Sequence, residues 1–344
     1  MTGGPRVAVI GASGVVGTTM LALLRERRFP AGEIVAFASP RSAGREVEGH
    51  AVQVLDDQAE IDGFDLALFS AGATVSREWA PRFVDAGAVV IDNSSAFRRE
   101  PEVPLVVAEA NPRALERHRG LIANPNCSTM QMVVALAPIH REAGIERLVV
   151  ATYQSVSGTG HKALEELEAQ ALASLDGADA PAPAVYPEPI AFNVIGAAGS
   201  FADGDDHTDE ERKLMFETRK ILEDDSIGIA VTCVRVPVRV GHSEAVNVQT
   251  RAPLSAAQAR ELLAHAPGVV LEDLPTPLRT AGRDEVCVGR IRRDESSPRT
   301  LSMWIVGDNL RKGAATNAVQ IAELLLERAL LWRAASSRST PRVR

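Results

Sequence analysis

At residues 6–17 the chain reads RVAVIGASGVVG, an apolar run followed by a turn that contains three glycines. The run at 6–10 has no polar alternation, which is typical of a strand buried on both faces, and 18–27 then carries Met and Leu at helical spacing. Glycines between a strand and a helix permit a tight turn and close approach of the backbone to a pyrophosphate, and the helix N-terminus attracts phosphates. We therefore expect a dinucleotide cofactor to bind the turn residues Gly11, Ala12, Ser13, Gly14, Val15, Val16 and Gly17.

The end of the next predicted strand, at 34–38, favours NADP(H) over NAD(H). An NAD site typically carries an acidic residue about 20 residues after the glycine turn, where it binds a ribose hydroxyl. This chain instead has Ser39, Arg41 and Ser42 in that region. Because a guanidinium attracts a 2′-phosphate and serine hydroxyls can donate hydrogen bonds to it, we expect these three residues to bind the cofactor.

The first 126 residues alternate strands and helices. Further apolar runs predict strands at 65–70, 88–92, 105–108 and 121–123, and helical spacing predicts a helix at 75–86. Unbroken apolar strands separated by helices imply a parallel sheet covered on both faces. The sequence therefore predicts an α/β protein with an N-terminal Rossmann-like domain at residues 1–126.

Residues 127–313 have a different pattern and predict a second domain. Helices are expected at 130–141, 161–174, 208–223 and 255–265, and strands at 148–154, 229–240, 245–250, 285–292 and 301–306. Short connections such as GHSE suggest a largely antiparallel or mixed sheet, and hence an α+β domain. A last helix at 314–332 can return to complete the first domain, and the Ser- and Arg-rich tail at 333–344 is predicted to be disordered.

The composition of the 344 residues, 45% hydrophobic and 24% charged, is that of a globular protein rather than a disordered one. No apolar run is long enough to span a membrane, and the N-terminus does not resemble a secretory signal. The net charge of −8 argues against nucleic acid as a partner. Three cysteines are too few for a disulfide framework, so we expect a cytoplasmic location.

Cys127, in the motif NPNCST, is predicted to be a nucleophile because it lies in a polar turn where a helix starts. A helix dipole contributes only about 0.3–1 kcal/mol, whereas one pKa unit requires about 1.4 kcal/mol. A nearby base or cation is therefore needed to form the thiolate. The predicted partner is His242, which follows a glycine between two strands and is able to accept a proton at pH 7. Cys233 and Cys287 lie within predicted strands and are expected to be buried core residues.

Two other kinds of site are not supported. The acidic run at 203–209 departs from an EF-hand, because Thr208 stands where glycine is required and Leu214 where a carboxylate is required, so no metal is expected. Thr208 with Glu211 fits a capping box for the helix that follows. The sequence has no G-x-S-x-G motif, which argues against a serine hydrolase.

Seven motifs occur in order and carry a resemblance that covers roughly residues 5–332: GASGVVG (11–17), SAGATVS (70–76), NSSAFR (93–98), NPNCST (124–129), YQSVSGTG (153–160), DEERK (209–213) and RVPVRVGHSE (235–244). With these motifs the chain closely resembles the bacterial aspartate-β-semialdehyde dehydrogenase family. The resemblance implies reduction of L-4-aspartyl phosphate to L-aspartate 4-semialdehyde with NADPH, in the biosynthesis of lysine, threonine, methionine and diaminopimelate. It also implies that the second domain is catalytic and forms a homodimer, with a tetramer as the alternative.

The resemblance also implies residue roles. Cys127 would attack the acyl phosphate, expel phosphate and form a thioester, His242 would handle the proton, and Gln154 would orient the acyl group. The substrate and phosphate would be bound by Arg98, Asn126, Ser157, Glu210, Lys213 and Arg235, with Glu210 meeting the α-ammonium, Arg235 the α-carboxylate, and Arg98 and Lys213 the phosphate. Further cofactor contacts would be Ser70, Ala71, Gly72, Asn93, Gly158 and Asn309.

Two alternative functions stay open on the sequence alone. N-acetyl-glutamyl phosphate reductase uses the same cysteine and histidine chemistry, but its acetylated nitrogen would leave Glu210 without a cationic partner. A catalytically silent NADP-binding sensor is the other alternative. The presence of Cys127, His242, Arg98 and Arg235 together argues against it, because a sensor does not need them.

Overall fold

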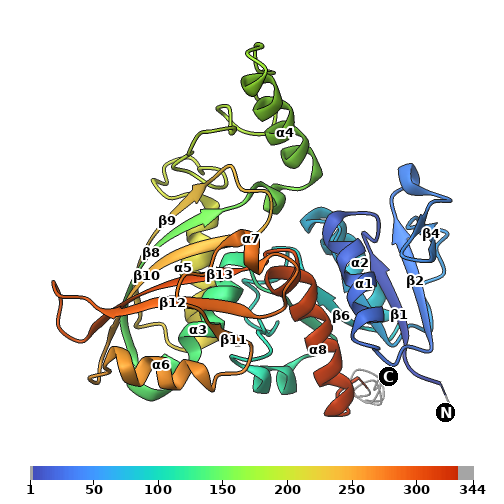
Figure 1. Cartoon of the computed structure of the whole chain (residues 1–344). Coiled ribbons are helices and arrows are strands. Elements are labelled where there is room, and N and C mark those ends of the chain that lie inside the picture. The colour runs from blue at the N-terminus through green and yellow to red at the C-terminus, as the bar shows by residue number, and fades with distance from the viewer. Residues whose placement is uncertain (1–2, 332–344) are drawn as a thin grey trace. The chain divides into compact units, whose positions relative to one another are not determined.

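A computed structural model describes residues 3–331 and divides into two compact units (Figure 1). The first unit contains the chain up to Pro125 and the segment from Ala314 onward, and the second contains Asn126–Gly313. Asn126 was predicted to end the first domain, but in the structure it belongs to the second unit, where its side chain caps the helix that follows it. Residue 332 and the tail at 333–344 lie outside the described residues. No helix within 3–331 has the length and apolarity needed to cross a membrane.

The first unit contains a seven-stranded sheet with the strand order β3-β4-β2-β1-β5-β6-β7. Neighbouring strands are parallel except for β3 and β4, which confirms the predicted parallel sheet. Its strands are β1 (Arg6–Ile10), β2 (Glu33–Ala38), β3 (Glu46–Val47), β4 (His50–Val54), β5 (Leu66–Phe69), β6 (Val89–Asp92) and β7 (Leu121–Ala123). The strands β3 and β4 were not predicted, because β3 has only two residues and only Val52 is buried in the two strands.

Helices cover this sheet on both faces because successive strand residues point to opposite sides. Val7 and Val9 of β1 pack in one core with α1 and α8, whereas Ala8 and Ile10 pack in another core with α2. This two-sided burial explains why β1 is an unbroken apolar run. The helical segments of the unit are α1 (Val15–Glu26), η1 (Pro40–Ser42), α2 (Ala73–Asp85), η2 (Pro112–Arg117) and α8 (Thr316–Glu327).

The strand predicted at 105–108 is wrong. Only Leu105 forms a bridge there, with Ala123. The backbone N–H groups of the third and fourth residues of this segment donate to side-chain oxygens of Asn111 (2.9 Å) and Asn317 (3.0 Å). Those donors are therefore not available to pair with a neighbouring strand.

The last helix is shorter than the predicted 314–332. The π-helical turn η4 (Arg311–Ala315) precedes α8, which ends at Glu327. The helix stops there because Ala329 has a positive φ of 51°, which an α-helix cannot continue through.

The second unit contains a six-stranded mixed sheet with the order β11-β12-β13-β10-β8-β9. The central strand β10 is antiparallel to both of its neighbours, whereas β8 with β9 and β11 with β12 are parallel pairs. The predicted mixed sheet is thus confirmed, although the short strand β11 was missed. The strands are β8 (Ile145–Gln154), β9 (Gly228–Arg235), β10 (His242–Thr250), β11 (Val269–Leu271), β12 (Val286–Arg293) and β13 (Thr300–Gly307).

One face of this sheet is packed against α3, α5 and α6, and Figure 1 shows α3 and α5 behind the strands. On the opposite face, Val149 and Tyr153 of β8 are 37% and 36% exposed. The helix α4 extends away from the sheet (Figure 1). The helical segments are α3 (Cys127–Ala143), η3 (Val156–Thr159), α4 (His161–Leu175), α5 (Asp209–Leu222), α6 (Ala256–Ala264) and α7 (Pro277–Thr280).

The strand predicted at 229–240 is too long, because β9 ends at Arg235. Pro237 has no N–H to donate to a sheet, so the ladder cannot continue through it. The chain turns between β9 and β10, and His242 is the first residue of β10. The predicted capping box of Thr208 and Glu211 is confirmed at the start of α5.

Candidate functional site

Two positions of the glycine turn in the first unit cannot carry a side chain. Gly11 has a φ of +81°, and a Cβ there would lie 2.4 Å from the carbonyl oxygen of Ser70. A Cβ on Gly17 would lie 2.1 Å from the carbonyl oxygen of Gly11. Both distances are far below van der Waals contact, so the turn requires glycine for close packing between β1, β5 and α1.

A cavity of about 620 Å³ opens beside this turn. Residues predicted to bind the cofactor that line it are Gly11, Ser13, Gly14, Ser39, Arg41, Ser70 and Ala71. Other predicted contacts of this unit are not in the lining, namely Ala12, Val15, Val16, Gly17, Ser42, Gly72 and Asn93. Ser42 still shapes the cavity indirectly, because its Oγ lies 3.0 Å from Oγ of Ser13.

Three acidic residues of the lining were not predicted, namely Asp56, Asp57 and Glu78. The two aspartates follow β4, which was not predicted, so nothing in the sequence placed them at this cavity. Arg82 pairs with Asp57 at 2.8 Å and with Glu78 at 3.7 Å. Arg41 is the exposed basic residue of the lining, and it fits an anionic group better than a neutral one.

Arg98 is a buried arginine of the first unit, with 7% of its surface exposed. Its Nε donates to the carbonyl oxygen of Asn124 and its Nη2 to that of Asn93, both at 2.9 Å. Asn93 and Asn124 follow β6 and β7, so the guanidinium is fixed at the carboxyl ends of two parallel strands. This is the edge at which open α/β sheets bind ligands.

Cys127 is the first residue of α3, in the second unit. Asn126 caps this helix, because its Oδ1 accepts hydrogen bonds from the backbone N–H groups of Ser128 (3.0 Å) and Thr129 (3.3 Å). Cys127 is partly exposed, and a Cβ on Gly313 would lie 2.9 Å from its Cβ. The cysteine therefore lies at the positive end of a helix dipole, with a glycine beside it that leaves room for its side chain.

The other two cysteines behave as core residues, as expected. Cys233 and Cys287 are buried, and burial raises the pKa of both thiols. A higher pKa disfavours the reactive thiolate. Among the described cysteines, only Cys127 lies at a helix N-terminus with partial access to solvent.

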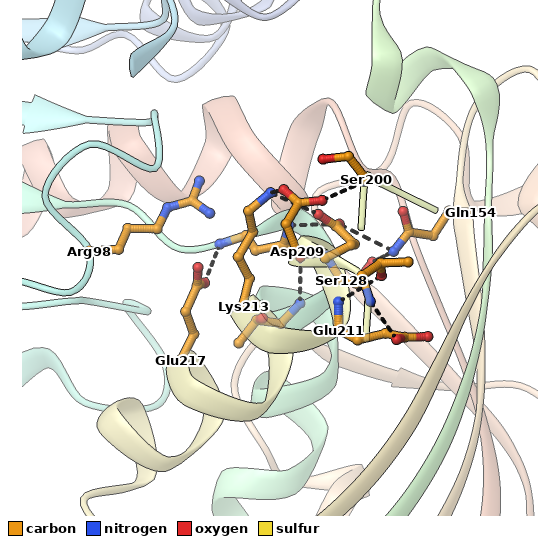
Figure 2. Close-up of polar contacts among 12 residues, drawn as sticks. Arg98, Ser128, Gln154, Ser200, Asp209, Glu211, Lys213 and Glu217 are labelled. Atoms are coloured by element: carbon orange, nitrogen blue, oxygen red, sulfur yellow. Dashed lines mark hydrogen bonds and ion pairs between the residues drawn. The ribbon is translucent and has the colours of Figure 1, made fainter. Parts of the chain in front are cut away.

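Glu210 joins several of the predicted substrate residues of the second unit. Its Oε1 accepts hydrogen bonds from Nδ2 of Asn126 at 2.8 Å and from Nε2 of Gln154 at 3.3 Å. Gln154 also donates to Oγ of Ser128 at 2.8 Å (Figure 2). Asn126 and Ser128, the two sequence neighbours of Cys127, are therefore both linked to the carboxylate of Glu210, the first directly and the second through Gln154.

Lys213 approaches the same carboxylate from one turn further along α5. Its Nζ lies 3.3 Å from Oε2 of Glu210 and 2.5 Å from Oδ2 of Asp209, and Figure 2 shows the contact with Asp209. Burial alone would lower the pKa of Lys213, but the two carboxylates outweigh it and raise the pKa. The ammonium therefore stays charged.

His242 is fully buried at the start of β10. Its Nδ1 accepts a hydrogen bond from the backbone N–H of Ser155 at 3.0 Å, and its Nε2 has no hydrogen-bond partner among residues 3–331. Burial and the nearby charge of Arg235 lower the pKa of His242 well below its usual range. A Cβ on Gly158 would lie 3.3 Å from Nε2 of the ring, so glycine keeps this side of the imidazole open.

The remaining predicted residues of the second unit surround the same ring. Arg235 is buried, and its Nη1 donates to the carbonyl oxygen of Ser155 at 2.7 Å. Asn309 accepts from Oγ of Ser157 at 3.2 Å and from the backbone N–H of Gly241 at 2.9 Å. Ser155 contacts His242, and the preceding residue, Gln154, contacts Ser128 at the start of α3. The two neighbouring residues therefore connect the histidine to the helix of Cys127.

Sequence reasoning missed four polar residues at this site. Ser155 acts through its backbone, Glu217 accepts from the backbone N–H of Asn126 at 2.6 Å, and Asp209 pairs with Lys213. Glu244 is fully buried on β10, and burial raises the pKa of its carboxyl well above its usual range. Residues 3–331 contain no group of three or more His, Cys, Asp or Glu side chains arranged to hold a metal ion.

Comparisons with known proteins match both units. Residues 6–118 match the family model for the semialdehyde dehydrogenase NAD binding domain, and residues 136–312 match that for the semialdehyde dehydrogenase dimerisation domain. Aspartate-semialdehyde dehydrogenase of Aquifex aeolicus is 50% identical over 340 residues, which cover 95% of this chain and 100% of the relative. That of Legionella pneumophila is 53% identical over 338 residues, covering 94% and 96% of the two chains.

Solved structures agree with these relatives. Aspartate semialdehyde dehydrogenase II from Vibrio cholerae is 48% identical, with a TM-score of 0.91 over 94% of this chain and 99% of that one. The structure of the same protein complexed with ASA has a TM-score of 0.91 at 47% identity, over 95% and 99% of the chains. The chain described here therefore belongs to the aspartate-semialdehyde dehydrogenase family.

Proposed function

We propose that this protein catalyses the NADPH-dependent reductive dephosphorylation of L-4-aspartyl phosphate to L-aspartate 4-semialdehyde, and the phosphate-dependent reverse reaction. This reaction serves the biosynthesis of lysine, threonine, methionine and diaminopimelate. The observation that carries the proposal is the Glu210 cluster, in which Asn126 caps the helix of Cys127 and also binds the carboxylate of Glu210. The side chain of one asparagine thus contacts both the start of the helix that carries the nucleophile and the carboxylate proposed to bind the substrate ammonium.

The first unit fits a nicotinamide dinucleotide. Gly11 and Gly17 leave the close backbone approach that a pyrophosphate needs, and the cavity beside them is lined by Ser39 and Arg41 at the end of β2. We propose that Arg41 binds the 2′-phosphate of NADP(H), with Ser39, Ser13 and Ser70 as further contacts. When bound, this cofactor supplies the hydride of the reduction.

Cys127 forms the covalent intermediate. Its sulfur attacks the acyl carbon of aspartyl phosphate, the C–O bond to phosphate breaks, and the leaving phosphate carries away the electron pair. The resulting thioester holds the acyl group in place for reduction, after which the C–S bond breaks and the aldehyde is released. In reverse, the thiolate adds to the aldehyde, loss of hydride to bound NADP⁺ would leave the thioester, and phosphate then attacks the acyl carbon as the C–S bond breaks and the thiolate is released.

The other site residues bind and orient. Glu210 binds the α-ammonium, Arg235 the α-carboxylate, and Gln154 the acyl group beside Ser128. Lys213 and Arg98 supply positive charge for phosphate, Ser157 completes the substrate contacts, and His242 serves the reacting oxygen and proton exchange. Asn93 and Gly158 remain proposed contacts of the cofactor.

The sheet of the second unit supports a homodimer. Val149 and Tyr153 are exposed on the face opposite α3 and α5, and the ring of Tyr153 lies 5.4 Å from that of Trp304. An aromatic and aliphatic face of this kind suits an interface between two copies. Sedimentation of the purified protein tests the dimer against the tetramer. A cytoplasmic location fits three cysteines that form no disulfide.

A phosphate-dependent assay tests the function. Wild-type protein is expected to reduce NADP when given aspartate semialdehyde and phosphate, and Cys127→Ala is expected to abolish that reduction while NADP binding is kept. Turnover of N-acetylglutamate semialdehyde in preference to the free amine would indicate an N-acetyl-glutamyl phosphate reductase. NADP binding by the wild type without turnover of either substrate would indicate a sensor.

A further inference from the structure

The hydrogen bonds of His242 determine which ring nitrogen carries its proton. A backbone N–H is always a donor, and the one on Ser155 points to Nδ1 of His242 at 3.0 Å. A nitrogen that accepts a hydrogen bond has a free lone pair, so the proton of the neutral ring must lie on Nε2. Burial and Arg235 favour the neutral ring by lowering its pKa, which strengthens this assignment.

A second group of contacts fixes the loop that presents this N–H. Asn309 Oδ1 accepts from the backbone N–H of Gly241 at 2.9 Å, and because that donor is obligatory, the orientation of the amide is determined. The same oxygen lies 3.0 Å from Oγ of Ser155 and 3.2 Å from Oγ of Ser157. Asn309 Nδ2 donates back to Ser157 at 2.9 Å. One buried asparagine thus joins the residue before His242 to the segment that contacts Nδ1.

The polar contacts that the structure shows for Asn309 are all within the protein. Its side-chain oxygen accepts from the backbone N–H of Gly241 and lies within hydrogen-bond distance of the hydroxyls of Ser155 and Ser157, one N–H of its amide donates to Ser157, and the residue is buried. The contacts suit a residue that holds the protein's own loops. They do not require the cofactor contact that the resemblance implies for it.

We propose that Ser155 and Asn309 are positioning residues that hold His242 as its Nε2–H tautomer, so that the ring presents a hydrogen-bond donor to the reaction centre. The atom that accepts this hydrogen bond would be the carbonyl oxygen of the acyl group on Cys127. Its identity rests on the function proposed above. That oxygen gains negative charge during reduction, and a fixed donor stabilises it.

The groups around the ring agree with this role. Arg235 on β9 places a positive charge near the imidazole, and burial raises the pKa of the carboxyl of Glu244, two residues along β10, well above its usual range. Gln131 on α3 donates to the carbonyl oxygen of His242 at 3.3 Å and therefore does not contact the ring nitrogens. Gly158 leaves the Nε2 side without a side chain.

NMR of protein labelled with ¹⁵N-histidine tests the tautomer directly, without substrate or cofactor. The signals of His242 are identified by their loss in His242→Gln. We expect long-range proton–nitrogen correlations of a neutral ring with its proton on Nε2, unchanged between pH 6 and pH 8. A ring with its proton on Nδ1, or an exchange average of both tautomers, would overturn the proposal even if the enzyme turns over aspartate semialdehyde.

Kinetics of variants test the positioning role. Asn309→Ala is expected to lower kcat about tenfold or more through loss of buried hydrogen bonds, with the Kd for NADP nearly unchanged. Ser155→Ala keeps the backbone donor, so it should keep the tautomer and lose less activity. Ser243→Ala is the matched control, because it removes a buried hydroxyl next to His242 on the opposite side of β10. A large rise in the Kd for NADP with kcat unchanged would instead make Asn309 a cofactor ligand.

The proposed function and the positioning role give different experimental outcomes when either is wrong. If His242 is the Nε2–H tautomer but aspartate semialdehyde is not turned over, the proposed function is wrong and the tautomer assignment stands. If turnover occurs but the Asn309→Ala and Ser243→Ala proteins have the same kcat, the positioning role is wrong. Should Asn309→Ala not fold, the wild-type tautomer and the Ser155→Ala kinetics still decide.

Discussion

Replacing Glu210 by glutamine is the perturbation whose effect the structure defines most closely. Each carboxylate oxygen accepts from a donor that cannot reverse its role: Asn126, whose own oxygen is fixed by the cap of α3, donates to Oε1, and Lys213 donates to Oε2. A glutamine amide has one oxygen and one NH₂ group. In either orientation its NH₂ group therefore faces another donor, and the charge that would bind the substrate ammonium is lost.

The magnitude follows from the kind of hydrogen bond removed. A hydrogen bond to a charged group contributes about 1.5–3 kcal/mol, and each 1.4 kcal/mol corresponds to about a tenfold change. We therefore expect Glu210→Gln to lower kcat/KM for aspartate semialdehyde about 10- to 100-fold. N-acetylated substrates have no ammonium to lose, so the variant should gain no defect towards them relative to wild type.

The assay is phosphate-dependent NADP reduction, with Glu211→Gln as the matched control. Glu211 is the next residue of α5, and its two oxygens accept from the backbone N–H groups of Thr208 (2.9 Å) and Cys233 (3.0 Å). Its loss should lower the Tm but leave kcat/KM of the folded enzyme near that of wild type. Equal losses of kcat/KM in the two variants, or full activity of Glu210→Gln, would refute the ammonium-binding role.

Three further predictions concern charge and packing. Burial raises the pKa of Glu244 in the folded protein above its value in the unfolded chain. The stability that this protonated carboxyl allows is therefore complete below the unfolded pKa and is lost as pH rises towards the folded pKa, by about 1.4 kcal/mol per pH unit. Glu244→Gln does not titrate, and its Tm relative to wild type should rise from pH 5 to pH 8; a constant difference would contradict this. Arg41→Ala should raise the Kd for NADP about 10- to 100-fold with little effect on NAD, measured by titration with both cofactors; unchanged NADP affinity would remove the 2′-phosphate assignment. Gly17→Ala should cost about 1–3 kcal/mol of stability and weaken cofactor binding, because its Cβ would overlap the carbonyl oxygen of Gly11. Thermal unfolding checks this, with Gly14→Ala as the control because its Cβ would lie 3.3 Å from the same oxygen. Equal Tm values for the two variants would contradict the prediction.

Local signals in the sequence were sufficient to predict much of the fold. The strand at 6–10 and its glycine turn are contiguous, and apolar burial on both faces of the sheet leaves an unbroken run. The strand predicted at 105–108 failed because two of its donors go to asparagine side chains, one of which, Asn317, is distant in sequence. The strand predicted beyond Arg235 failed because Pro237 ends the ladder.

The site was predictable in its residue types but not in its contacts. Cys127 could be found because a polar turn before a helix is a local pattern. No sequence pattern indicates that Ser155 contacts His242 through its backbone N–H, because every residue except proline has this group. Glu217 was missed for a related reason, since a glutamate within an amphipathic helix gives no sign that it accepts from the backbone of Asn126. Such contacts depend on tertiary structure.

The most direct test of the central claim is mass spectrometry of the protein quenched with acid during turnover of aspartate semialdehyde, NADP and phosphate. We predict an aspartyl adduct on the peptide that contains Cys127, present in wild type and missing in Cys127→Ala. Product formation at the wild-type rate with no adduct on that peptide, at quench times shorter than one turnover, would contradict the thioester mechanism.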